Sequence, residues 1–65
     1  MAIIGQLNEK FNYFEFQFKT GNKILITGKY KTHSLSNGYL ALETENDIIS
    51  CYLSDLDYIN FKISQ

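Results

Sequence analysis

The sequence predicts a small all-β protein of five or six short antiparallel strands. Apolar and polar residues alternate along several short segments, which is the period of a strand with one buried face. Turn residues such as Gly21 and Asn46 separate these segments. The clearest expected strands cover residues 13–19, 23–31, 39–45, 48–53 and 58–63.

The N-terminal segment fits two structures. Residues 2–7 suit a strand in which Gly5 marks a bulge or a close backbone approach. A short helix over residues 2–11 is the alternative, because apolar residues also recur there at helical spacing. Glycine inside a helix costs about 1 kcal/mol relative to alanine, so we favour the strand. Residues 8–12 then form a turn.

Residues 13–19 supply the expected centre of the core. Phe14, Phe16 and Phe18 share one face of this strand. A stacking platform for nucleic-acid bases is the functional alternative for three such rings. A domain this small has few other side chains large enough to fill its interior, so we expect the rings to be buried.

A tight turn at residues 20–23 leads into the strand over 23–31, whose face with Ile24, Ile26 and Tyr30 is expected to point inward. Gly28 interrupts this strand where a barrel strand would bend sharply. The polar stretch 32–38 is expected to be a linking segment.

The C-terminal half continues the pattern. Residues 54–57 are expected to form a short turn, with one turn of 3₁₀ helix capped by Ser54 or Asp55. In the last strand the residues expected to face inward are Ile59, Phe61 and Ile63.

A sheet of short strands in a chain of 65 residues must curl to cover its apolar face and its edges. We expect one domain over residues 1–65, a small barrel of the SH3-like or OB-like kind or a strongly curled sheet. An open sheet paired with a second copy is the alternative. A domain this small buries only about 60% of its unfolded surface, so a partner or self-association is an expected source of further stability.

Two segments resemble parts of the Sm-like or SH3-like small barrels. Residues 20–28 resemble the turn and bent second strand of the Sm fold, and residues 53–59 resemble the short turn before its last strand. Sm-like RNA binders carry an Asp and Asn pair in the loop after the bent strand, whereas residues 33–38 contain no Asp. They also carry a basic residue followed by Gly where this chain has Ser50-Cys51. The resemblance therefore implies a fold and not an RNA pocket.

The composition argues against catalysis and metal binding. One cysteine, Cys51, excludes an intramolecular disulfide, and Cys51 with the single histidine cannot complete a tetrahedral zinc site. His33 is the sole candidate base, and its neighbours Ser34 and Ser36 suit a polar turn. We expect no enzyme, no cofactor and no metal.

The chain also carries indications of its cellular setting. No segment approaches the roughly 18 apolar residues of a membrane span, and the N-terminal residues lack the pattern of a secretory signal. With a lone thiol, this favours the cytoplasm. Val, Arg and Pro are absent while Ile, Lys and Asn are plentiful, which indicates a low-GC genome such as a Gram-positive bacterium, its phages or its plasmids.

Charge is unevenly distributed along the sequence. Residues 1–33 carry a net charge of +3 and residues 34–65 a net charge of −4. If the two halves occupy different sides, one side is basic and the other acidic. Such a surface would steer a protein partner or close a ring of copies head to tail. Tyrosine is also frequent, and it is enriched at interfaces. The expected partner-binding residues are Tyr39, Tyr52, Glu43, Glu45, Asp47, Asp55 and Asp57.

A second set of residues would suit nucleic acid. Lysines around the bent strand could contact phosphates while an aromatic ring stacks on a base. The slightly acidic net charge and the absence of arginine argue against this alternative. Its candidate residues are Lys19, Lys23, Lys29, Lys31, Tyr30 and His33.

The sequence thus favours a non-enzymatic binding module that acts through its surface. The small size and the coding bias suggest a phage or mobile-element protein that inhibits a host or defence protein. An oligomeric barrel that captures a nucleotide or nucleic acid between subunits is one alternative, and a structural subunit of a larger assembly is another.

Overall fold

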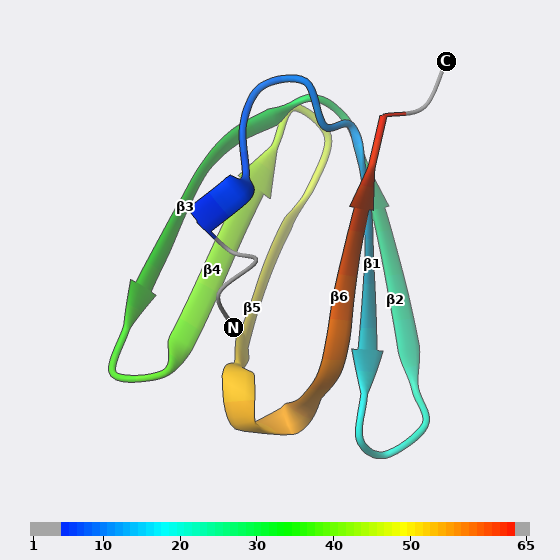
Figure 1. Cartoon of the computed structure of the whole chain (residues 1–65), viewed down its shortest axis with the longest axis vertical. Coiled ribbons are helices and arrows are strands. Elements are labelled where there is room, and N and C mark those ends of the chain that lie inside the picture. Colours follow the sequence, from blue (N-terminus) through cyan, green and yellow to red (C-terminus); the bar gives the residue numbers. More distant parts are fainter. Residues whose placement is uncertain (1–4, 64–65) are drawn as a thin grey trace.

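The computed structural model describes residues 5–63 and contains six β-strands in two antiparallel sheets of three strands each (Figure 1). The all-β class is therefore confirmed. The strands are β1 (Tyr13–Phe18), β2 (Lys23–Thr27), β3 (Tyr30–Ser36), β4 (Tyr39–Thr44), β5 (Ile48–Tyr52) and β6 (Leu56–Lys62).

The strand orders are β2-β1-β6 in one sheet and β3-β4-β5 in the other. Figure 1 shows the two sheets side by side, with the segment between β2 and β3 crossing at one end and the segment between β5 and β6 at the other. No strand pairing joins the two sheets within the described residues, so they do not form the closed barrel that was one form of the expected fold. The arrangement is two facing sheets linked by a bent segment.

The bend between β2 and β3 occurs at Gly28, as the sequence predicted. Its φ of +104° is a conformation that side-chain-bearing residues rarely adopt, and a Cβ here would lie 2.9 Å from the backbone nitrogen of Asn46. Thr44 holds the same corner: its buried hydroxyl donates to the carbonyl of Thr27 at 2.7 Å and accepts the Asp47 N–H at 3.1 Å. The bent segment and the β4–β5 turn are therefore packed against each other.

The core lies between the sheets and includes Phe14 and Phe16, both fully buried, as the alternation in β1 predicted. Phe18, at the end of β1, is partly buried and packs against this cluster. The other buried apolar residues are Ile26, Leu40, Leu42, Ile49, Leu56 and Ile59. Both sheets contribute to one continuous core, so neither sheet is an independent unit.

Residues 5–11 adopt neither of the two expected structures. Residues 2–4 of the expected strand lie outside the described residues, and Gly5 and Gln6 form a short 3₁₀ turn. The turn over 8–12 is confirmed, since Asn8 accepts a hydrogen bond from the Lys10 N–H through its side chain. Residues 5–7 pair with none of the six strands.

The expected linking segment over 32–38 is wrong. Residues 30–36 form β3, which pairs with β4 through a two-residue turn at Asn37 and Gly38. Both turn residues have positive φ, +52° and +76°, as such hairpin turns require. Most of β3 is exposed, so burial imposed no apolar alternation on its sequence.

The last elements begin earlier than expected. The 3₁₀ turn spans Leu53–Asp55 and follows Tyr52 with no side-chain cap, so the expected cap by Ser54 or Asp55 is wrong. In β6 Ile59 is buried and Phe61 half-buried, but Ile63 lies beyond the end of the strand and is exposed. Leu56 at the start of β6 fills the core position instead.

Replacing Gly28 should destabilise the protein more than replacing another glycine of similar φ. Gly21 has a φ of +98° but nothing within 4 Å of its added Cβ, so Gly21→Ala reports backbone strain alone. Gly28→Ala adds a backbone clash, and we expect it to cost at least about 1 kcal/mol more in the free energy of unfolding. Urea denaturation of the two variants measures this difference. Equal losses would show that the contact with Asn46 does not constrain the corner.

Candidate functional site

The outer face of the β3-β4-β5 sheet is the candidate site. Residues that pair directly across antiparallel strands share a face, so the register defines this surface. Leu40 and Leu42 point into the core, and their neighbours along β4 therefore point outward. The outer face has three rows across the strands: Ser36, Tyr39 and Tyr52; Ser34, Ala41 and Ser50; Thr32, Glu43 and Ile48.

Large side chains stand at the two ends of this face and small ones lie between them. Tyr39 and Tyr52 are 42% and 55% exposed and contact each other edge to face, with ring centroids 4.8 Å apart. At the opposite end Ile48 is 68% exposed. Apolar and aromatic groups exposed around a floor of small residues are typical of a contact surface.

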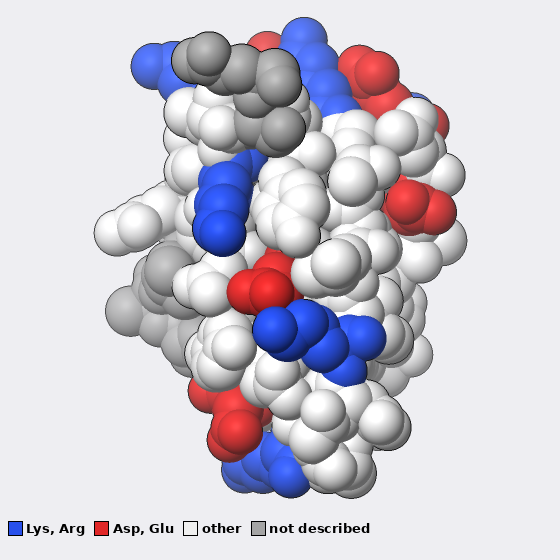
Figure 2. Space-filling model, turned by 90° about the vertical axis from the view of Figure 1, so that its right-hand side faces the viewer, with Lys and Arg blue, Asp and Glu red and all other residues white. Residues whose placement is uncertain are grey.

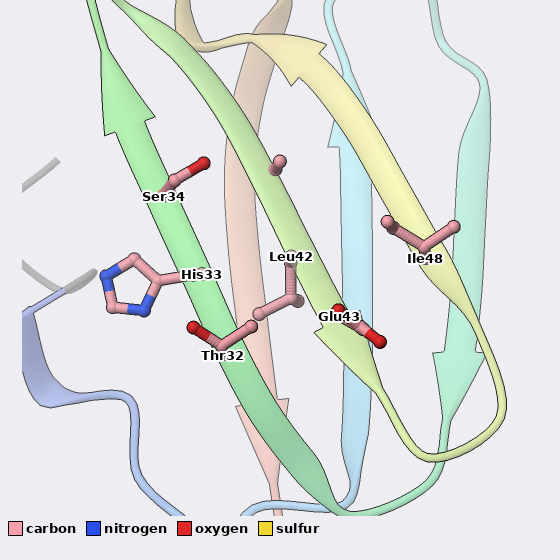
Figure 3. A pocket seen from close by; sticks show the side chains of 7 residues that line it. Thr32, His33, Ser34, Leu42, Glu43 and Ile48 are labelled. Atoms are coloured by element: carbon pink, nitrogen blue, oxygen red, sulfur yellow. The ribbon is translucent and has the colours of Figure 1, made fainter.

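A shallow hollow of about 160 Å³ opens on this face. It is lined by side chains of β3 and β4, including Thr32, Ser34 and Glu43, and by Ile48 of β5. Figure 3 shows the His33 ring directed away from Glu43 and Ile48, toward the opposite side of β3. The hollow is smaller than the usual site for a small molecule, so it suits a side chain of a partner.

The outer face of β3-β4-β5 has one charged side chain, Glu43. Lys31, at the start of β3, lies 3.6 Å from the Glu43 carboxylate, so this charge is paired. Both groups are substantially exposed, and the pair contributes little to stability. A surface with so little net charge can be covered by a partner without a large desolvation cost.

The five acidic residues proposed from the sequence do not form one patch. Glu45 and Asp47 lie at the turn before β5, whereas Asp55 and Asp57 follow its other end. Five residues of extended strand separate these pairs by about 14 Å. Only the second pair lies at the same end of β5 as Tyr52.

The lysines of the nucleic-acid alternative are also dispersed. Lys19 and Lys23 flank the β1–β2 turn, while Lys29 and Lys31 follow the far end of β2. Lys23 is paired with Glu15 at 3.1 Å. No continuous basic track connects these positions.

The two aromatic members of that alternative are engaged with each other. The Tyr30 hydroxyl lies 2.7 Å from His33 Nδ1, and both residues are partly buried on the inner side of β3. Tyr30 also packs against the core. Neither ring is presented for stacking on a base.

The outer face of the β2-β1-β6 sheet differs in kind. Glu15 at its centre accepts a hydrogen bond from the Asn60 amide at 3.1 Å and pairs with Lys23, and the Lys62 ammonium lies over the Tyr13 ring. Figure 2 shows basic and acidic side chains interspersed on the side of the molecule that it presents. The polar side chains of this face therefore interact with one another across the strands.

Two observations bear on catalysis and metal binding. Burial is the main reason why the pKa of the Cys51 thiol is raised, and the negative charge of the nearby Asp55 raises it further. The reactive thiolate is therefore disfavoured. Among residues 5–63 no three His, Cys, Asp or Glu side chains gather closely enough to hold a metal ion.

Comparisons with family models, with curated proteins and with solved structures found no match to this chain. Across the described residues no helix has the length and apolarity to cross a membrane.

Sequence reasoning identified the two tyrosines of the outer face but missed Ile48 and the small residues between them. The parity of β5 was the available signal: Ile48, Ser50 and Tyr52 alternate with the inward-facing Ile49 and Cys51. Two isoleucines stand side by side at the start of this strand, so hydropathy alone does not distinguish the exposed Ile48 from the buried Ile49.

Replacing Glu15 should change the acid dependence of stability. The hydrogen bond from Asn60 and the ion pair with Lys23 hold the pKa of the Glu15 carboxyl below its ordinary value of 4.5. Its contribution is therefore present above that pH and is lost as the pH falls through the lowered pKa. Urea midpoints at neutral and acidic pH should differ less in Glu15→Gln than in the natural protein. An unchanged pH dependence would show that these contacts do not favour the ionised form.

Proposed function

We propose that this protein is a non-enzymatic binding module that recognises another protein through the outer face of β3-β4-β5. The observation that carries the proposal is the exposed pair of Tyr39 and Tyr52 facing Ile48 across a floor of small residues. Tyrosine offers a large, rigid contact area with few rotatable bonds, which is why it recurs among residues that dominate binding energy.

The element order supports a likeness to the SH3-like and Sm-like domains. A hairpin is followed by a bend at a glycine, a three-stranded meander, one 3₁₀ turn and a strand that returns to β1. Here this arrangement is open between the sheets. The likeness adds no ligand of its own, because one fold hosts many functions.

An inhibitor that covers a functional surface of a host or defence protein is the form of binding module that we favour. Inhibition by coverage requires a rigid contact surface and no catalytic group, and a domain of 65 residues can supply such a surface. The coding bias toward a low-GC genome supports a phage or another mobile element as the source.

Substituting Tyr39 and Tyr52 should weaken binding of the partner. The matched control is Tyr58→Ser, because Tyr58 is 41% exposed, nearly as much as Tyr39, but lies on the outer face of the other sheet. We expect the Tyr39→Ser/Tyr52→Ser variant to bind the partner at least about tenfold more weakly, as truncation of dominant contact residues does. The partner is defined as a protein that the natural chain retains from lysate of a low-GC Gram-positive bacterium, and we expect Tyr58→Ser to bind it as tightly as the natural chain does.

Affinity is then measured with the purified partner, and melting temperatures show that each variant is folded. Equal affinity for the double variant and the natural chain would remove the proposed contact face. Loss of binding in Tyr58→Ser alone would place the contact on the opposite sheet.

A further inference from the structure

Three of the four edge strands carry features that hinder pairing with another chain. Edge strands expose unpaired backbone groups, and proteins protect them with lysines, bulges or covering segments. β3 has Lys31 as the extra residue of a bulge, and the Tyr30 N–H donates to the carbonyl of Phe11 in the N-terminal segment. β6 has a bulge at Asp57 and also carries Lys62.

β2 is protected by a lysine and by an occupied carbonyl. Lys23 stands at its first position, and the carbonyl of Thr27 at its last position accepts the Thr44 hydroxyl.

β5 is the exception. It pairs with β4 in continuous register over its whole length, without a bulge, and contains no lysine. Two hydrogen bonds at the ends of the hairpin, Thr44 N–H to Asp47 and Leu53 N–H to Gly38, show which residues of β5 direct their backbone groups toward β4. In an antiparallel pair every second residue does so, and these residues are therefore Ile49 and Cys51.

The N–H and C=O groups of Ile48, Ser50 and Tyr52 therefore point away from β4. Within residues 5–63 none of these groups bonds to another segment. Their side chains belong to the proposed contact face, so one occupant could use the open edge and contact Tyr52 and Ile48 together.

We infer that β5 accepts an extended segment of the protein partner as an added strand, and that this segment is basic at its two ends. Backbone hydrogen bonds would supply affinity, and alternate side chains would lie beside Ile48 and Tyr52. This inference rests on the proposed function and names the form of the partner's contact.

Charge identifies the ends of the segment. Glu45 and Asp47 precede β5, Asp55 and Asp57 follow it, and the chain has no lysine or arginine between Lys31 and Lys62. None of these four carboxylates is in an ion pair within the described residues. Basic residues at both ends of an added strand would match these charges.

The same charges oppose a second copy that would pair through its own β5. Antiparallel pairing of two β5 strands around Ser50 places Ile48 beside Tyr52 of the other copy. It also brings the turn with Glu45 and Asp47 of each copy toward Asp55 of the other, at both ends. Like charges so placed repel, which favours a different chain as the occupant.

The test uses the full chain made by chemical synthesis, with the backbone nitrogen of Ser50 methylated. Methylation removes one outward N–H and leaves the β4–β5 bonds intact. The matched control is methylation of the backbone nitrogen of Leu25 in β2. The hydrogen bonds from Phe18 N–H to Asn22 and from Gly28 N–H to Asn12 show that the backbone groups of Ile24 and Ile26 point toward β1. The N–H of Leu25, between them, therefore points away from β1, as the N–H of Ser50 points away from β4. The probe is a short peptide in which threonine and isoleucine alternate between pairs of lysines.

We expect the peptide to bind the unmodified chain with a dissociation constant below about 1 mM and to slow hydrogen exchange at Ile48, Ser50 and Tyr52. Methylation at Ser50 should weaken binding at least tenfold and methylation at Leu25 should leave it unchanged. Binding should weaken as salt rises from about 50 to 200 mM, and a peptide with glutamates in place of the lysines should bind at least tenfold more weakly. Ser50→Lys, which adds a protective lysine, should weaken binding of the lysine-flanked peptide if the methylated chain does not fold.

No binding to β5, equal effects of the two methylations, or indifference to the peptide's charge would each overturn the inference. A dimer of the unmodified chain that methylation at Ser50 dissociates would show that a second copy occupies the edge, and would overturn it too. Binding of the partner defined above distinguishes failure of this inference from failure of the proposed function. If that partner requires Tyr39 and Tyr52 but tolerates methylation at Ser50, strand addition fails and the contact face stands. If it requires neither, both fail.

Discussion

The packing of the Gly28 bend against the β4–β5 turn determines how the two sheets face each other. Gly28 can hold its positive φ and approach Asn46 because it lacks a side chain, and Thr44 ties the last carbonyl of β2 to the same turn. β3 begins directly after this corner, so its direction sets that of the whole β3-β4-β5 sheet. The exposed face with Tyr39 and Tyr52 therefore depends on a glycine far from it.

Strand order brings some opposite charges from the two halves of the chain together, although the four carboxylates that flank β5 have no ion pair within the described residues. β6 pairs with β1, and β3 pairs with β4, so each sheet combines strands from both halves of the chain. Lys31 consequently meets Glu43 across two neighbouring strands. The remaining asymmetry is between the two outer faces: one is crosslinked by polar contacts around Glu15, and the other is nearly uncharged.

The sequence predicted the elements in which burial imposes a pattern. The alternation around Phe14 and Phe16 gave β1, and Gly28 was correctly placed at a bend. β3 was missed because an exposed edge strand has no apolar face to alternate, although Asn37 and Gly38 carried the hairpin signal. The exposure of Tyr39 and Tyr52 followed from strand parity. The acidic residues lie at the two opposite ends of β5, and their proximity in the sequence did not show this separation.

The pairing of β6 with β1 has a consequence for biosynthesis. Glu15 and Asn60, which are hydrogen-bonded across these strands, are 45 positions apart in the chain. Until the ribosome has released β6, β1 and β2 can form only an isolated hairpin, and such hairpins are barely stable in water. The apolar residues of β1 therefore cannot be enclosed by both sheets until β6 has left the ribosome, and until then they stay exposed to other chains.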